Sequence, residues 1–274
     1  MDSWLDALRA RLPRHAALIE SLLELCRADP RVRVLELQCS IARGVGDELS
    51  DLDLGMAVRD EGWQQVADEL PEQLRGIAPV VDLLAHAIPE WGTRPHRRLF
   101  VQYVDGRQID LVVQPASSIA GRVPGAIVLY DLDGRLAEER TVSSAAATPS
   151  DVRAWEVLGW ELLANVDKYL ERGSAWEALA RLDQARDLAL RLWAAGEAVP
   201  YPGFGLTSLL DADPPILPAG LDATAARAEL RELAAAAAAC AELLRNASAR
   251  ARERIGAEAG ESPMAEWVSA RLAR

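Results

Sequence analysis

Hydrophobic and polar residues are arranged in the first half of the chain so that helices and strands are both predicted. Apolar residues at helical spacing predict a helix from about His15 to Ala28, which ends before Pro30. Two apolar runs, Val32 to Leu37 and Leu52 to Val58, predict buried strands. Further strands are predicted at Val80 to Ile88, Arg98 to Val104, Gln108 to Val113 and Ala126 to Tyr130.

A helix is also predicted between these strands, at residues 61 to 75. Its apolar side chains recur at helical spacing, but Pro71 lacks a backbone N–H and is unfavourable for its second half. Asp105-Gly106 is typical of a hairpin turn between two of the strands.

The pattern changes after Pro149, where only helices are predicted. They cover residues 151–172, capped by Ser150, then 174–195, roughly 224–252, and 263–272. A stretch rich in proline and glycine, 197–220, separates the second and third of them. The sequence therefore predicts an α+β domain at residues 1–145 and a helical bundle domain at residues 146–274.

Composition and charge exclude several classes of protein. The formal net charge of the 274 residues is −12, and no cluster of Lys or Arg is long enough to follow a nucleic-acid backbone. An acidic protein is better suited to a cationic small molecule, although an acidic surface commonly serves only solubility. The start of the chain does not resemble a signal peptide, and no run approaches the roughly 18 apolar residues of a membrane helix. With three cysteines in no metal or disulfide spacing, we expect a cytoplasmic protein that binds neither nucleic acid nor membranes.

Asp51 and Asp53 are the first candidates for chemistry. Alternate residues of a strand point to the same side, so the two carboxylates share a side while Leu52 and Leu54 point into the core. Neighbouring carboxylates repel each other unless a cation lies between them. Mg²⁺ is commonly held by one or two carboxylates together with water and substrate phosphates. We therefore expect a metal–nucleotide site here.

Asp110 and Ser40 extend this candidate site. Asp110 lies inside the apolar strand Ile109 to Val113, where an aspartate is costly to bury unless it is paired or metal-bound. It is a third candidate metal ligand, and the alternative is an ion pair with an arginine such as Arg98 or Arg107. Ser40 opens a glycine-bearing turn that could hold phosphates, or it could simply cap that turn.

These motifs resemble a known family. Ser40-Ile-Ala-Arg-Gly44, then Ser50-Asp-Leu-Asp-Leu54, and a later strand with Ile109-Asp-Leu111 are similar to the nucleotidyltransferase pattern of the DNA polymerase beta superfamily. The helical half, particularly Lys168-Tyr-Leu-Glu-Arg-Gly-Ser-Ala-Trp176, resembles the aminoglycoside adenylyltransferase branch. The resemblance implies a mixed β-sheet flanked by helices, followed by an all-α bundle, and transfer of AMP from ATP with Mg²⁺ to a hydroxyl.

The resemblance also implies roles for single residues. Asp51 and Asp53 would bind the metal, and Asp110 would be a third ligand or the base that faces the acceptor hydroxyl. Ser40 would contact the triphosphate, and Arg43 would be a phosphate or structural partner. The family has glycine before the serine, where this chain has Cys39. Cysteine is tolerated there if its φ angle is negative.

Lys168 is a further candidate because it is the only lysine among the 30 lysines and arginines. It could neutralise the β- and γ-phosphates of a nucleotide, or it could be an ordinary surface lysine. A base from the helical half is also possible, with Glu156, Glu161 and Asp167 as candidates.

The sequence therefore predicts a Mg²⁺-dependent enzyme that adenylylates a small, cationic acceptor such as an aminoglycoside antibiotic, with ATP as co-substrate. Two alternatives stay open. One is a nucleotidyltransferase that modifies a protein. The other is a non-catalytic, nucleotide-binding or regulatory descendant, for which Cys39 is the only indication.

Overall fold

The chain forms two compact units, Met1–Val142 and Ser143–Arg274, in the computed structural model. The structure describes residues 2–88, 95–140, 146–256 and 260–273. The domain boundary predicted between residues 145 and 146 adjoins the segment 141–145, which lies outside the described residues.

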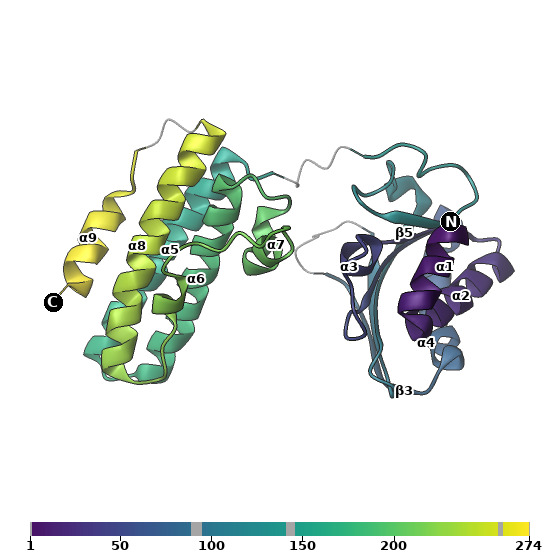
Figure 1. Ribbon diagram of the computed structural model, residues 1–274, viewed down its shortest axis with the longest axis horizontal. Coiled ribbons are helices and arrows are strands. Elements are labelled where there is room, and N and C mark those ends of the chain that lie inside the picture. The colour runs from purple at the N-terminus through teal and green to yellow at the C-terminus, as the bar shows by residue number, and fades with distance from the viewer. Residues whose placement is uncertain (1, 89–94, 141–145, 257–259, 274) are drawn as a thin grey trace. The chain divides into compact units, whose positions relative to one another are not determined.

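The first unit is built on a six-stranded sheet with the strand order β3-β4-β5-β2-β1-β6 (Figure 1). The strands are β1 (Val32–Leu37), β2 (Leu52–Val58), β3 (Val80–His86), β4 (Arg97–Tyr103), β5 (Gln108–Pro115) and β6 (Ile127–Asp131). β2 and β5 pair in parallel, and the other neighbouring strands are antiparallel. The parallel pair lies in the middle of the sheet, which is therefore mixed.

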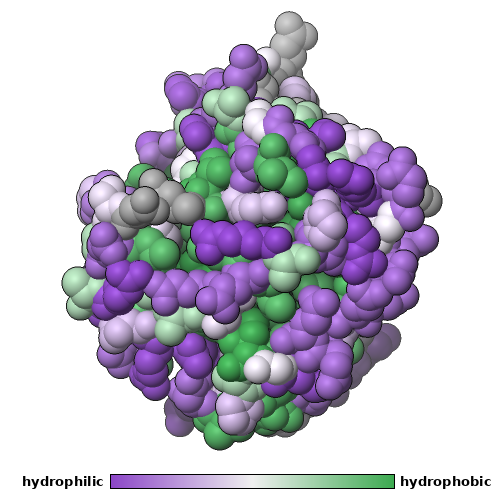
Figure 2. Space-filling view, turned by 90° about the vertical axis from the view of Figure 1, so that its right-hand side faces the viewer, coloured by the Kyte–Doolittle hydropathy of each residue, from purple (hydrophilic) through white to green (hydrophobic). Residues whose placement is uncertain are grey.

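Helices α1 (Asp2–Arg11), α2 (Pro13–Ala28) and α4 (Trp63–Ile77) cover one side of this sheet (Figure 1). Alternate strand residues point toward them and form the core, among them Leu54, Leu99 and Leu111. Figure 2 shows the surface at the right of Figure 1, where these helices lie, with hydrophobic patches between mostly hydrophilic side chains. Asp53, Asp110 and Arg98 point to the other side of the sheet, whereas Arg97 of β4 points toward α4.

Helix α4 continues through Pro71, which the sequence indicated as unfavourable for its second half. Leu70 and Leu74, on either side of the proline, are both buried in the core. Their burial stabilises the helix by more than the proline weakens it.

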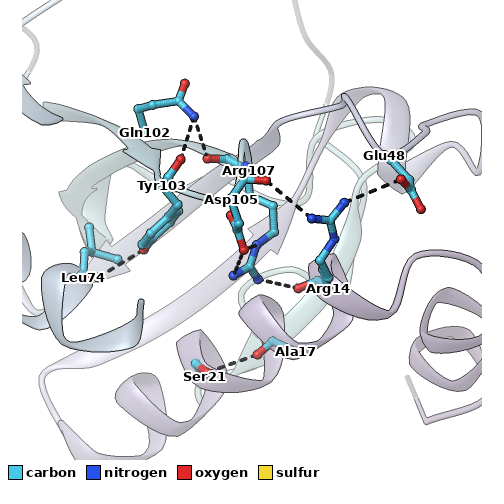
Figure 3. Close-up of polar contacts among 9 residues, drawn as sticks. All are labelled: Arg14, Ala17, Ser21, Glu48, Leu74, Gln102, Tyr103, Asp105 and Arg107. Carbon is cyan, nitrogen blue, oxygen red and sulfur yellow. Dashed lines mark hydrogen bonds and ion pairs between the residues drawn. The ribbon is translucent and has the colours of Figure 1, made fainter. Parts of the chain in front are cut away.

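The hairpin turn between β4 and β5 is attached to the start of α2 (Figure 3). Arg107 donates a 2.6 Å hydrogen bond to the backbone oxygen of Arg14 and pairs with Asp105. The hydroxyl of Tyr103 donates to the backbone oxygen of Leu74 at 3.2 Å. These contacts from two helices hold the end of β5 from which Asp110 projects.

The second unit is helical and has its own core. Its helices are α5 (Pro149–Glu171), α6 (Ala175–Gly196), α7 (Leu206–Leu210), α8 (Leu230–Ile255) and α9 (Pro263–Leu272). Gly159 of α5 lies against Leu244 of α8, where an added Cβ would come within 2.9 Å of the leucine methyl carbons. A side chain at position 159 would therefore require Leu244 to move, and glycine lets the two helices pack closely there.

Two helix starts in this unit differ from the sequence prediction. The cap of α5 is Thr148, which exchanges hydrogen bonds with Asp151 in a capping box, rather than Ser150. Helix α8 begins at Leu230 rather than near residue 224, because Leu221–Thr224 forms a separate 3-10 turn. The Thr224 hydroxyl donates to the Leu221 oxygen at 2.6 Å and holds that turn.

The predicted fold class is confirmed, because the chain is α+β with a mixed sheet flanked by helices and a helical C-terminal part. Within the described ranges, no helix combines the length and apolar character needed to cross a bilayer.

Glu156 of α5 is almost fully buried and forms an ion pair with Arg252 of α8. It also accepts a hydrogen bond from the backbone N–H of Ser262, at 3.3 Å. A buried carboxylate that loses its cation is strongly destabilising, whereas replacing both partners by apolar residues is often close to neutral.

We expect Arg252→Met to lower the free energy of unfolding by about 3 kcal/mol, because it leaves the buried Glu156 carboxylate only the exposed Arg153, whose Nη1 lies 3.4 Å from Oε2. The double variant Glu156→Met with Arg252→Met should recover most of this loss. Urea unfolding followed by circular dichroism measures both. Arg254→Met, at an exposed position of the same helix, is the control and should change the stability by less than about 0.5 kcal/mol. A double variant no more stable than Arg252→Met would contradict the prediction.

Candidate active site

Asp53 and Asp110 lie side by side on the two parallel strands. They are partners in the register of β2 and β5, on the side of the sheet opposite the helices. Asp51 directly precedes β2 and, being two residues before Asp53, lies toward the same side. The structure therefore brings together the three carboxylates that the sequence singled out.

Asp53 has a raised pKa. Its burial is the main reason why its pKa is raised to about 6, and the negative charges of Asp51 and Asp110 raise it further. A hydrogen bond from the Cys39 thiol acts in the opposite direction. Asp53 thus carries its negative charge at neutral pH at a cost in free energy, which the nearby charge of Arg98 reduces.

Asp110 is paired with Arg98 of β4. The guanidinium donates from Nε to Oδ1 at 2.8 Å, and Nη2 donates to Oδ2 in the second half of a bidentate pair. Arg98 lies opposite Val112 in the register of β4 and β5, so its side chain is on the carboxylate side of the sheet. The sequence named this ion pair as the alternative to a metal-bound Asp110, and the structure shows that the pair is formed.

The donor set suits Mg²⁺, although the observed conformation is not a closed metal site. In the described part of the chain, no group of three or more His, Cys, Asp or Glu residues is arranged to hold a metal ion. Arg98 takes up both oxygens of Asp110, which leaves Asp51 and Asp53 as the available pair. Two carboxylates are enough for Mg²⁺, which completes its shell with water and phosphate oxygens. The guanidinium of Arg98, which binds Asp110, also shows that this cluster of carboxylates accommodates a cation.

Cys39 and Ser40 begin a short helix, α3 (Cys39–Ala42), directly after β1. Cys39 has a φ angle of +57°, in the left-handed region that favours glycine. The negative φ angle under which cysteine would be tolerated here is therefore not adopted. Cys39 instead has a backbone conformation that suits glycine better than cysteine.

The turn after α3 is tightly closed. The Ser40 backbone oxygen accepts hydrogen bonds from the N–H groups of Val45 (3.1 Å) and Gly46 (3.0 Å). A Cβ at Gly46 would lie 2.6 Å from the Ile41 side chain, so only glycine fits there. The Ser40 side chain is half-buried, and its contact with phosphate stays a prediction.

The loop between α3 and β2 is held by the first two helices. Arg11 donates to the backbone oxygen of Gly44, and the His15 ring nitrogen Nε2 lies 2.8 Å from the backbone oxygen of Ser50. Arg14 forms an ion pair with Glu48 at 3.5 Å (Figure 3). The segment that precedes Asp51 is therefore positioned by α1 and α2, and no pattern in the sequence connects His15 with it.

Glu36 is a fourth carboxylate on the same side of the sheet, and the sequence analysis missed it. It lies on β1 opposite Gly55 of β2, and burial raises its pKa. The Gln38 side chain donates to it at 3.0 Å and the Val123 N–H at 3.3 Å. Its signal in the sequence was an acidic residue between two leucines, near the end of the apolar run from Val32 to Leu37.

Arg43 and Lys168 have different surroundings. Arg43 is exposed at the end of α3, and its positive charge lowers the pKa of Cys39, although burial and Asp53 raise it to about 12 overall. Lys168 lies in the second unit, on α5, where its Nζ donates to Asn165 at 2.5 Å and lies 4.6 Å from the Tyr169 ring centre. Phosphate binding by either cation stays a prediction.

Two of the three candidate bases in the helical unit are engaged in ion pairs. Glu156 pairs with Arg252, and Asp167 pairs with Arg271 at 2.5 Å. Both carboxylates are buried, whereas Glu161 is exposed. Glu156 and Asp167 therefore serve the packing of the helices.

Comparisons with known proteins gave a similarity in structure. No protein-family model matches the chain, and no curated protein matches its sequence. Among solved structures, the chain is similar to an aminoglycoside 6-adenyltransferase from Bacillus subtilis, with a TM-score of 0.44 and 16% sequence identity. The similarity covers 93% of this chain and 96% of that one. At this distance it assigns neither residues nor a substrate to this protein.

We expect Cys39→Gly to be more stable than Cys39→Ala by about 1 kcal/mol, because only glycine adopts a left-handed backbone without strain. Both variants remove the thiol that donates to Asp53, so their difference isolates the backbone effect. Thermal and urea unfolding of the two variants measure it. Equal stabilities, or a more stable alanine variant, would show that position 39 is unstrained.

We also expect a pH-dependent stabilisation by Asp53→Asn. An aspartate with a pKa of about 6 in the folded protein and about 3.9 in the unfolded chain is protonated in both states below pH 3.9, so it has no effect there. As pH rises to 6 the folded state becomes progressively less favourable. Above pH 6 the asparagine variant should be more stable by up to about 3 kcal/mol in the absence of metal.

Urea unfolding in EDTA between pH 4 and 8 measures this difference. Asp82→Asn on the exposed edge strand β3 is the control and should show no such trend. A difference between Asp53→Asn and the unmodified protein that does not grow between pH 4 and 6 would contradict the assignment of the raised pKa.

Proposed function

We propose that the first unit is the catalytic part of a Mg²⁺-dependent nucleotidyltransferase that transfers AMP from ATP to a hydroxyl of a small, cationic acceptor. The observation that carries this proposal is the register of the parallel strands, which sets Asp53 beside Asp110 with Asp51 two residues away on the same side. A cluster of three carboxylates at the middle of a sheet lowers the stability of the fold unless it has a function. Such a cluster can hold a divalent cation, and the cation neutralises the negative charge of phosphates during the reaction.

Asp51 and Asp53 would hold Mg²⁺, which supplies electrostatic stabilisation of the phosphates and of the leaving pyrophosphate. Asp110 would either complete that set of ligands or accept the proton of the attacking hydroxyl. The closed turn that begins with Ser40 would contact the triphosphate. Arg43 and Lys168 are the cations proposed to contact phosphates.

The non-catalytic alternative rests on Cys39 alone. Cysteine in place of glycine was the only indication of a degraded phosphate turn. Its φ angle of +57° is strained for cysteine, yet the Ser40 backbone oxygen closes the turn with two hydrogen bonds. We therefore keep the active enzyme as the proposal.

The net charge of −12 supports a cationic acceptor. Together with the motif resemblance, it favours an aminoglycoside-like antibiotic with ATP as the nucleotide. A protein acceptor is the second candidate within the same enzyme class.

The test is an assay of the full chain with radiolabelled ATP, Mg²⁺ and a panel of aminoglycosides, with pyrophosphate release measured in parallel. We expect label on an acceptor, and we expect Asp53→Asn and Asp110→Asn to lower the rate by roughly 100-fold or more, as when a group that stabilises a charged transition state is removed. Asp82→Asn should leave the rate unchanged. Label on added protein instead of the antibiotics would support the second candidate. No pyrophosphate release with any acceptor, and no thermal shift with ATP, would refute the proposal.

A further inference from the structure

The carboxylate side of the sheet carries its own cation. Arg98 donates through both Nε and Nη2 to the two oxygens of Asp110, in the fork geometry that guanidinium groups form with carboxylates. The charges of Asp53 and Asp51 also stabilise the protonated form of Arg98. One guanidinium thus interacts with all three carboxylates of the candidate site.

We propose that Arg98 is the internal counter-ion of this site and competes with the divalent cation for Asp110, so that metal binding releases Arg98 from its ion pair. The inference rests on the proposed metal site and adds to it a residue that regulates its occupancy. Asp110 cannot direct the same oxygen lone pairs to a guanidinium and to a metal ion. Two cations held by one cluster would also repel each other.

The neighbouring residue shows that this placement is specific to Arg98. Arg97 lies opposite Val113 in the strand register, on the helix side of the sheet, and pairs with Asp68 of α4 at 3.5 Å. Arg98 lies on the other side, because successive strand residues alternate. The sequence Arg97-Arg98 therefore places one arginine on each side of the sheet. Of the two, Arg98 faces the carboxylates.

The Arg98 side chain is exposed enough to leave its ion pair with Asp110. Its side chain is 37% exposed, whereas that of Asp110 is 19% exposed. A half-exposed guanidinium can leave the carboxylate and be solvated, so the ion pair can be exchanged for a metal ion.

Binding of Mn²⁺ alone to the full chain tests the proposal, measured by electron paramagnetic resonance and by the thermal shift that Mn²⁺ causes. Removing the competing cation in Arg98→Gln should tighten Mn²⁺ binding roughly tenfold, the order expected for one charge at a partly exposed site. Without metal, Arg98→Gln should be less stable, and the Mn²⁺-induced thermal shift should be larger than in the unmodified protein. Arg97→Gln is the matched control and should bind Mn²⁺ like the unmodified protein.

A second variant, Arg98→Lys, keeps a positive charge but not the fork and should bind Mn²⁺ with intermediate affinity. It tests the proposal even where Arg98→Gln does not fold. The double variant Asp53→Asn with Arg98→Gln should lose Mn²⁺ binding, which locates the signal at this site.

The outcomes separate this inference from the proposed function. If the unmodified protein binds Mn²⁺ and both Arg98 variants bind it equally well or more weakly, the counter-ion role is refuted and the metal site stands. If neither the unmodified protein nor any Arg98 variant binds Mn²⁺ at millimolar concentration, the metal site itself fails, and the counter-ion role fails with it.

Discussion

The parallel pairing of β2 with β5 decides where the charges of this protein lie. It places two aspartates beside each other in the middle of a sheet whose other side is fully occupied by an apolar core. Like charges at this distance repel, and partial burial removes the water that would screen them. The rest of the first unit is arranged so that this unfavourable cluster is held in place and partly neutralised.

Three kinds of contact stabilise the cluster. Arg98 neutralises it directly, the thiol of Cys39 donates to Asp53, and helices α1 and α2 hold the loop that leads to Asp51. Cys39 does so from a strained backbone conformation. Such strain costs about 1–3 kcal/mol at a residue and persists only where the surroundings determine the conformation. It lies here next to the carboxylates, where a rigid turn would be useful for binding phosphates.

The second unit is stabilised differently. Its core is formed by α5, α6 and α8, and its buried charges are neutralised in pairs between helices, as in Glu156 with Arg252. Carboxylates that looked like possible bases in the sequence are therefore part of the packing. The first unit differs, because there three aspartates lie together on one side of the sheet and Arg98 pairs with one of them.

The sequence alone determined the strands, most of the helices and the candidates Asp51, Asp53 and Asp110, because alternation and apolar burial are local properties of the chain. The family resemblance, and not the local pattern, placed the three aspartates in one site. It also identified Cys39 as the unusual position. Only the tertiary structure decided the φ angle of Cys39, the pairing of Asp110 with Arg98 and the burial of Glu36. Each of these depends on which strands become neighbours, and residues far apart in the sequence reveal no register until the chain has folded. Whether a carboxylate meets a cation or another carboxylate is a property of that register.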